Sequence, residues 1–96
     1  MNRIELFKES LLAVKRLEER YPLSDPLRSV TAQIEYLIGL ESGASSDTSK
    51  LKDINIGLVA ARMIEDMDMN VADKLHLVSA EARSMIADTL MQNATK

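Results

Sequence analysis

The chain has 96 residues, which allow one hydrophobic core, and no cysteine, which excludes a disulfide framework and a thiolate metal site. Hydrophobic residues make up 46% of the sequence but aromatic residues only 3%, so the core must consist mainly of aliphatic side chains and methionine, which favours helices packed on helices. The net charge of −3 argues against a nucleic-acid-binding protein. We therefore expect an all-α protein, a compact four-helix bundle that forms a single domain over residues 1–96.

Charged residues are unevenly distributed along the chain. Four of the first ten residues are charged, so they lack the apolar segment of a signal peptide, and we expect a cytoplasmic protein without a membrane segment. Between Tyr21 and Asp73, nine acids and four bases give a balance of −5, whereas the two ends together carry +2. This acidic middle is either an ordinary solvated surface or a surface that steers a basic partner protein into contact.

The first helix is predicted over residues 2–20. Pro22 ends it, because proline disfavours the helical conformation of the residue before it. Its apolar positions repeat every three or four residues and form one buried face: Ile4, Phe7, Leu11, Val14 and Leu17.

The second helix is predicted over residues 26–41, with Asp25 as the capping residue and Pro26 at the first helical position. Its inward face consists of Leu27, Val30, Ile34, Leu37 and Ile38. An uncharged second stripe lies about 120° around the helix and consists of Ser29, Ala32, Gln33, Tyr36 and Leu40. The stripe either packs on another helix of the bundle or binds a partner with Tyr36 as its anchor.

The third helix is predicted over residues 49–67, after a polar connection from which Asp47 or Thr48 caps it. Apolar side chains surround most of its circumference, so we expect the most buried helix of the bundle, covered from more than one side. Gly57 in its middle indicates the close approach of a neighbouring helix.

The fourth helix is predicted over residues 71–91 with Asn70 as its cap. Its apolar positions again define one face: Val71, Leu75, Val78, Ala82, Met85 and Ile86.

No catalytic, metal or cofactor motif is complete in this sequence. Asp66-x-Asp68-x-Asn70 resembles the start of a calcium loop, but Val71 and Leu77 occupy the positions that require glycine and glutamate. The chain has one histidine and no glycine-rich phosphate loop. We therefore expect a protein that is not an enzyme, with no metal and no cofactor.

Three stretches of the chain resemble a known family when taken together. They are Arg20-Tyr21-Pro22, then residues 33–37 (QIEYL), and then the pattern from Leu51 through Ile56-Gly57 and Ala60-Ala61-Arg62 to the acidic run Glu65-Asp66-x-Asp68. In order and spacing they are similar to the small helical immunity proteins of bacterial type VI secretion, over roughly residues 11–82. Those proteins serve interbacterial competition by neutralising effector toxins that destroy NAD and NADP.

The resemblance implies an antitoxin-type immunity protein that binds a cognate effector and blocks its active site by occlusion. The effector would be an NAD(P)-glycohydrolase or an ADP-ribosyltransferase with a basic, NAD-binding cleft. We predict a binding surface with an anchor and a charged rim. The anchor consists of Gln33, Tyr36 and Leu40, and the rim of Glu35, Glu41, Arg62, Glu65, Asp66 and Asp68.

The alternative is a homodimeric helical adaptor or scaffold without a toxin partner. In that case the uncharged second stripe of the helix over residues 26–41 would form the dimer contact. The sequence leaves open whether the free protein forms homo-oligomers, and it predicts neither a nucleic-acid nor a membrane partner.

Overall fold

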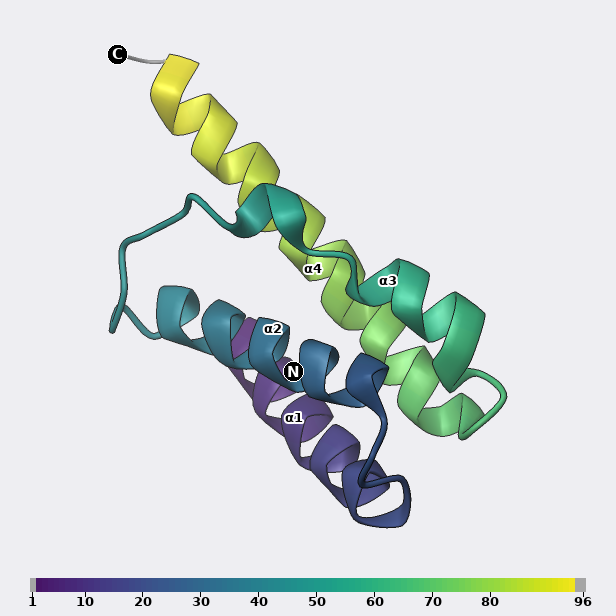
Figure 1. The fold of residues 1–96 in the computed structure, drawn as a ribbon. Helices are drawn as coiled ribbons and strands as arrows, with labels where there is room; N and C mark the ends of the chain where they lie inside the picture. Colours follow the sequence, from purple (N-terminus) through teal and green to yellow (C-terminus); the bar gives the residue numbers. More distant parts are fainter. Residues whose placement is uncertain (1, 95–96) are drawn as a thin grey trace.

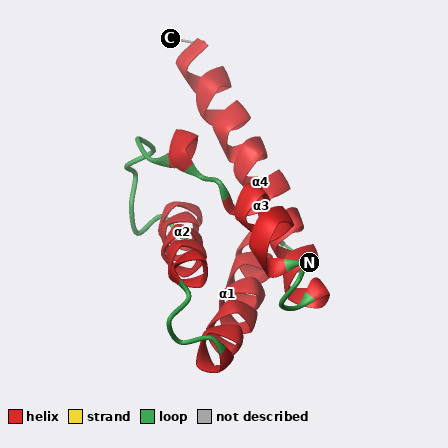
Figure 2. Cartoon of the chain, turned by 45° about the vertical axis from the view of Figure 1, so that its right-hand side comes forward, coloured by secondary structure: helices red, strands yellow, loops and turns green. Residues whose placement is uncertain are grey.

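The computed structural model describes residues 2–94, with side chains to residue 91, and in this part of the chain it contains helices and loops but no strand (Figure 2). The elements follow in the order α1 (Arg3–Arg20), α2 (Asp25–Glu41), η1 (Leu51–Asp53), α3 (Ile56–Val59), η2 (Ala60–Ile64) and α4 (Met69–Ala94). The all-α, four-helix prediction is confirmed. None of the described helices is long and apolar enough to cross a membrane.

The helices α1 and α2 form an antiparallel hairpin, and α4 lies across it (Figure 1). The Asn2 side chain caps α1 by accepting a hydrogen bond from the backbone N–H of Glu5 at 2.9 Å. The predicted cap of α2 was wrong by one residue: the Ser24 hydroxyl accepts the N–H of Leu27, and Asp25 is the first helical residue. Serine caps as well as aspartate does, so residue type alone did not distinguish the two.

The long helix α4 begins before its predicted start, and its cap is Asp68 rather than Asn70. A carboxylate oxygen of Asp68 accepts the N–H of Val71 at 3.1 Å, while Asn70 lies inside the helix. The last turns of α4 extend beyond the other helices and give the molecule its longest dimension of 47 Å (Figure 1). The predicted end at residue 91 is three residues short of the end of the helix.

The core lies where α1, α2, α3 and α4 meet. Its largest fully buried side chains come from all four helices and from η2: Phe7, Val14, Leu27, Val30, Ile34, Leu37, Ile56, Ile64, Leu75 and Val78. Apart from Ile56 and Ile64, these residues belong to the inward faces predicted from the three- and four-residue spacing. Ile4, Leu11 and Ile38 lie at their edges and remain partly accessible to solvent.

The predicted third helix over residues 49–67 was wrong as one continuous element. A single 3-10 turn at Leu51–Asp53 is followed by extended backbone at Ile54 and then by one turn of α-helix and a π-helical turn. Nor is this the most buried part of the bundle, because Leu58 and Met63 are about half exposed at 51% and 49%. The segment packs on α4, its turn α3 also contacts α2, and Leu58 and Met63 face the solvent.

The break has one local cause and one that is distant in the sequence. Isoleucine, asparagine and glycine in residues 54–57 have low helix propensity. In addition, the Gln33 side chain provides a hydrogen-bond acceptor for the N–H of Asn55 outside any helix.

The close helix contact predicted at Gly57 is confirmed. A Cβ atom at this position would lie 2.6 Å from the Ser79 hydroxyl oxygen and 3.1 Å from the Ser79 Cβ of α4. Only the absence of a side chain allows the two backbones to approach so closely.

Candidate partner-binding surface

Only part of the uncharged second stripe of α2 contacts the rest of the protein: Gln33 and Tyr36 bond to the connection between α2 and α3, while Ser29 and Ala32 are exposed. The Tyr36 hydroxyl donates a hydrogen bond to the Asp47 carbonyl at 2.6 Å and accepts one from the N–H of Lys50 at 3.2 Å. The chain leaves α2 through Gly43, whose φ of +83° lies in the left-handed region that favours glycine. Tyr36, predicted as the anchor for a partner, thus holds the connection in place.

Gln33 performs the same task at the other end of this connection. Its carbonyl oxygen accepts the backbone N–H of Asn55 at 2.9 Å, and its amide nitrogen donates to the Asn55 side chain at 2.7 Å. This pair of bonds draws the chain onto α2 just before α3 begins. The polar atoms of both Gln33 and Tyr36 therefore form hydrogen bonds within the protein.

The predicted residues at the carboxyl end of α2 lie beside the start of α1. Leu40 packs against the core, and Glu41 forms an ion pair with Arg3 at 3.3 Å. Arg3 also pairs with Glu81 of α4 at 3.2 Å. Burial alone would lower the pKa of Arg3, but these two carboxylates outweigh it and raise the pKa. Arg3 thereby links α1, α2 and α4. Glu35, the other rim residue predicted on α2, is exposed.

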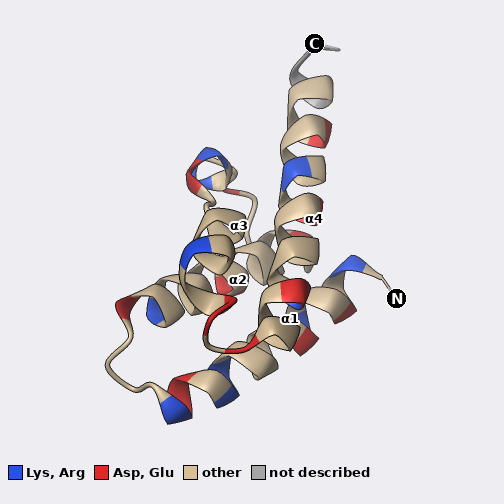
Figure 3. Cartoon of the chain, turned by 90° about the vertical axis from the view of Figure 1, so that its right-hand side faces the viewer, with Lys and Arg blue, Asp and Glu red and all other residues tan. Residues whose placement is uncertain are grey.

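The remaining predicted residues lie at the opposite end of α2. Glu65, Asp66 and Asp68 form an acidic turn between η2 and α4, which lies beside α1 in Figure 3. Arg62 and Asp66 are exposed, Glu65 pairs with His76 at 2.8 Å, and Asp68 caps α4. Because α2 has 17 residues, about 25 Å separates its two ends. The nine predicted residues therefore do not form one continuous site.

An exposed apolar surface next to the acidic turn was not predicted. We call it the apolar end cluster. The α1–α2 connection and the η2 region line a shallow hollow of about 640 Å³ through Tyr21, Pro22, Leu23, Pro26, Met63 and Met67. Leu23 is 87% exposed, the most exposed large apolar side chain in the described part of the chain. The available signal was an apolar residue inside the turn-forming stretch Pro22-Leu23-Ser24-Asp25-Pro26, which we interpreted only as a helix boundary.

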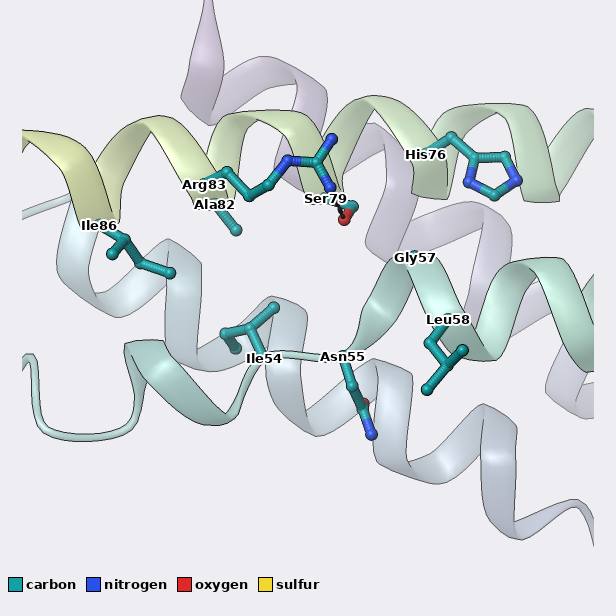
Figure 4. A pocket seen from close by; sticks show the side chains of 9 residues that line it. All are labelled: Ile54, Asn55, Gly57, Leu58, His76, Ser79, Ala82, Arg83 and Ile86. Atoms are coloured by element: carbon teal, nitrogen blue, oxygen red, sulfur yellow. Dashed lines mark hydrogen bonds between the residues drawn. The ribbon is translucent and has the colours of Figure 1, made fainter.

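A second groove of about 520 Å³ runs between residues 54–58 and α4 (Figure 4). Ile54, Ala82 and Ile86 form its apolar part, and Gly57 and Ser79 face each other where it narrows. The polar side chains that border it are engaged with neighbours, since His76 contacts Glu65 and Arg83 donates to the Ser79 hydroxyl at 3.5 Å. The described residues contain no group of three acidic or histidine side chains that could hold a metal ion.

Comparison with family models adds the decisive observation, because the Tsi6 model matches residues 2–84. The chain belongs to the Tsi6 family. This is a family of type VI secretion immunity proteins, so the resemblance seen in the sequence is confirmed at that level. Searches of curated proteins and of solved structures found no significant match.

The Tsi6 match covers every element up to the middle of α4. It includes all nine residues predicted for binding and the whole apolar end cluster, while the projecting turns of α4 beyond residue 84 lie outside it. Membership of this family implies an effector protein as the partner. The relevant site is therefore a protein-binding surface.

Proposed function

We propose that this Tsi6-family protein is the cytoplasmic immunity partner of one secreted effector toxin and neutralises it by covering its active-site cleft. The toxin would consume NAD or NADP, either as a glycohydrolase or as an ADP-ribosyltransferase. The observation that carries the proposal is the family match over residues 2–84. The protein contributes a binding surface and no chemistry of its own.

Occlusion requires a surface that stays rigid when it meets its partner, because ordering flexible segments on binding lowers affinity. Several contacts support such rigidity here. The long connection after α2 is held by Tyr36 and Gln33, and Arg3 links α1, α2 and α4. These contacts support a binding surface that is already formed in the free protein and does not fold on its target.

Charge supports the choice of toxin class. A cleft that binds the two phosphates of a dinucleotide should be basic, and the stretch between Tyr21 and Asp73 carries a balance of −5. Complementary charge mainly raises the rate of association and excludes wrong partners. The acidic turn is the part of the predicted rim that is closest to an exposed apolar surface.

The proposal is tested with a candidate NAD-consuming toxin domain, sought among the genes that neighbour this one. Bacteria that express the toxin domain alone should lose NAD and stop growing, and co-expression of this protein should restore both. The purified proteins should elute together as one complex. If NAD falls equally in both cultures and no complex forms, the proposed function is wrong. A stable dimer of this chain alone would then support the adaptor alternative.

A further inference from the structure

The α1–α2 connection holds Leu23 out of the molecule in a fixed conformation. The N–H of Ser24 donates to the Tyr21 carbonyl at 3.1 Å, and the Ser24 hydroxyl caps α2. Pro22 on one side further limits the backbone, and the Arg20 guanidinium lies 5.8 Å from the centre of the Tyr21 ring. An exposed leucine on such a short, bonded connection loses little conformational freedom when a partner covers it.

The opposite wall of the hollow depends on the π-helical turn η2. The N–H of Glu65 reaches back five residues to the Ala60 carbonyl at 3.0 Å, which defines this turn. Turns of this kind are rare and occur frequently at functional sites. Met63 lies in this turn and Met67 follows it, and both line the hollow together with Leu23. Methionine adapts its shape to an incoming surface and is common in binding sites.

Charges surround this apolar hollow in an uneven way. On the α2 side Arg28 pairs with Asp25, and on the α1 side Arg20 lies over the Tyr21 ring. On the η2 side Arg62 precedes the acidic turn, which carries three carboxylates within four residues.

This arrangement matches the anatomy of a protein interface, in which an apolar centre is bordered by a charged rim. A two-fold dimer through the cluster would bring two acidic turns into the same interface, because such a contact joins identical surfaces. The charges therefore favour a basic partner over a second copy of this chain.

We propose that the apolar end cluster is the surface on which the effector docks. Leu23, Met63 and Met67 would receive an apolar side chain of the effector, and the acidic turn would pair with a basic side chain next to it. The proposal rests on the proposed function, since the occupant is the effector. It assigns the anchor to the α1–α2 connection instead of Tyr36.

The test compares two exposed leucines in binding to the same candidate toxin domain. Leu23→Glu should weaken binding at least about thirtyfold, mainly through faster dissociation, without lowering the melting temperature. Leu90→Glu is the matched control, because Leu90 is 63% exposed on the projecting end of α4. It should stay within about twofold of the parent, as exposed substitutions away from a site usually do. Leu23→Ser serves as a second variant that adds no charge and should also weaken binding.

The charge of the rim is tested in the same assay. Asp66→Lys should slow association and reduce its dependence on salt, whereas Glu9→Lys on the exposed face of α1 should change neither. Asp66 is the suitable carboxylate of the three because its side chain is exposed, whereas Asp68 caps α4 and Glu65 pairs with His76.

Three outcomes are distinguishable. If the parent binds and both Leu23 variants bind equally well, the docking surface is wrong and the proposed function stands. If Leu23→Glu instead separates a dimer of the parent and leaves toxin binding unchanged, the cluster joins two copies of this chain. If the parent does not bind the toxin domain at all, both proposals fail.

Discussion

The three glycines of this chain should respond to alanine in different ways, and Gly57 is the informative one. An alanine Cβ at position 57 would lie 2.6 Å from the Ser79 hydroxyl oxygen, which would have to rotate away, and 3.1 Å from the Ser79 Cβ, which would have to move back by a few tenths of an ångström. Overpacking of this kind costs about 1–3 kcal/mol, while the gain in helix propensity returns at most about 1 kcal/mol. We therefore expect Gly57→Ala to destabilise the fold by about 1 kcal/mol, a fall in melting temperature of about 4–8 °C.

Gly39 and Gly43 are the controls for this prediction. At Gly39, inside α2, a Cβ would meet only the Ser45 Cβ at 3.9 Å, so Gly39→Ala should stabilise the protein by about 0.5–1 kcal/mol. At Gly43 a Cβ has open space, but the φ of +83° makes Gly43→Ala unfavourable by about 1 kcal/mol. Steric space and backbone conformation are thereby tested separately.

A double-mutant cycle in urea identifies the atoms responsible at Gly57. Ser79→Gly removes both atoms within 3.1 Å of the added Cβ, so Gly57→Ala should be neutral or stabilising in that background. The coupling free energy should be about 1–2 kcal/mol. If Gly57→Ala stabilises the parent as Gly39→Ala does, the close contact between α3 and α4 does not exist.

Substitutions at four further positions test individual contacts. Ser10→Ala removes a fully buried hydroxyl that has no hydrogen-bond partner among the described residues, so it should raise the free energy of unfolding by about 1 kcal/mol in urea titrations. Tyr36→Phe should cost about 1 kcal/mol and accelerate amide exchange at Lys50, whose N–H would lose its acceptor; unchanged exchange would contradict the tether. Asp68→Ala should cost about 1 kcal/mol through loss of the α4 cap, and Asp68→Ser should restore most of it. Hydrogen bonds from the Ser49 hydroxyl and N–H lower the pKa of Asp47. The contribution of the Asp47 carboxylate to stability is therefore complete above the ordinary aspartate pKa and is lost as the pH falls through the lowered pKa. Ser49→Ala should raise the pKa of Asp47 in an NMR titration.

These contacts also change how the predicted rim should be tested. Reversing the charge of Glu65, Asp66 and Asp68 together would disturb the fold as well as the surface, because Asp68 caps α4 and Glu65 contacts His76. Only Asp66 of the three can report on association with little effect on stability. The sequence shows three acidic residues within four positions, but it does not show which of them form hydrogen bonds within the protein.

Much of the fold followed from local patterns in the sequence. The spacing of apolar residues in α1 and α2 predicts their buried faces, and Pro22 and Pro26 place the end of α1 and the start of α2 within one residue. The third helix was predicted wrongly because its pattern was judged by hydrophobicity alone. The two hydrogen bonds between Gln33 and Asn55 join residues 22 positions apart, and no local pattern contains them.

The candidate site was less predictable than the fold for a related reason. The residue types of Gln33 and Tyr36 suggested an interface, and both do make specific polar contacts, but within the chain. Leu23 lies in a stretch that reads as a turn, and its position opposite Met63 arises only when the hairpin folds against η2. A partner-binding surface depends on which side chains the fold leaves exposed together.

The most direct test of the central claim is a titration of effector activity. The candidate toxin domain is mixed with increasing amounts of this protein, and the rate of NAD loss is measured. Occlusion of the cleft predicts that inhibition is complete at one molar equivalent and that prior saturation with NAD slows its onset. A stable complex in which the toxin keeps its full rate of NAD consumption would contradict the account.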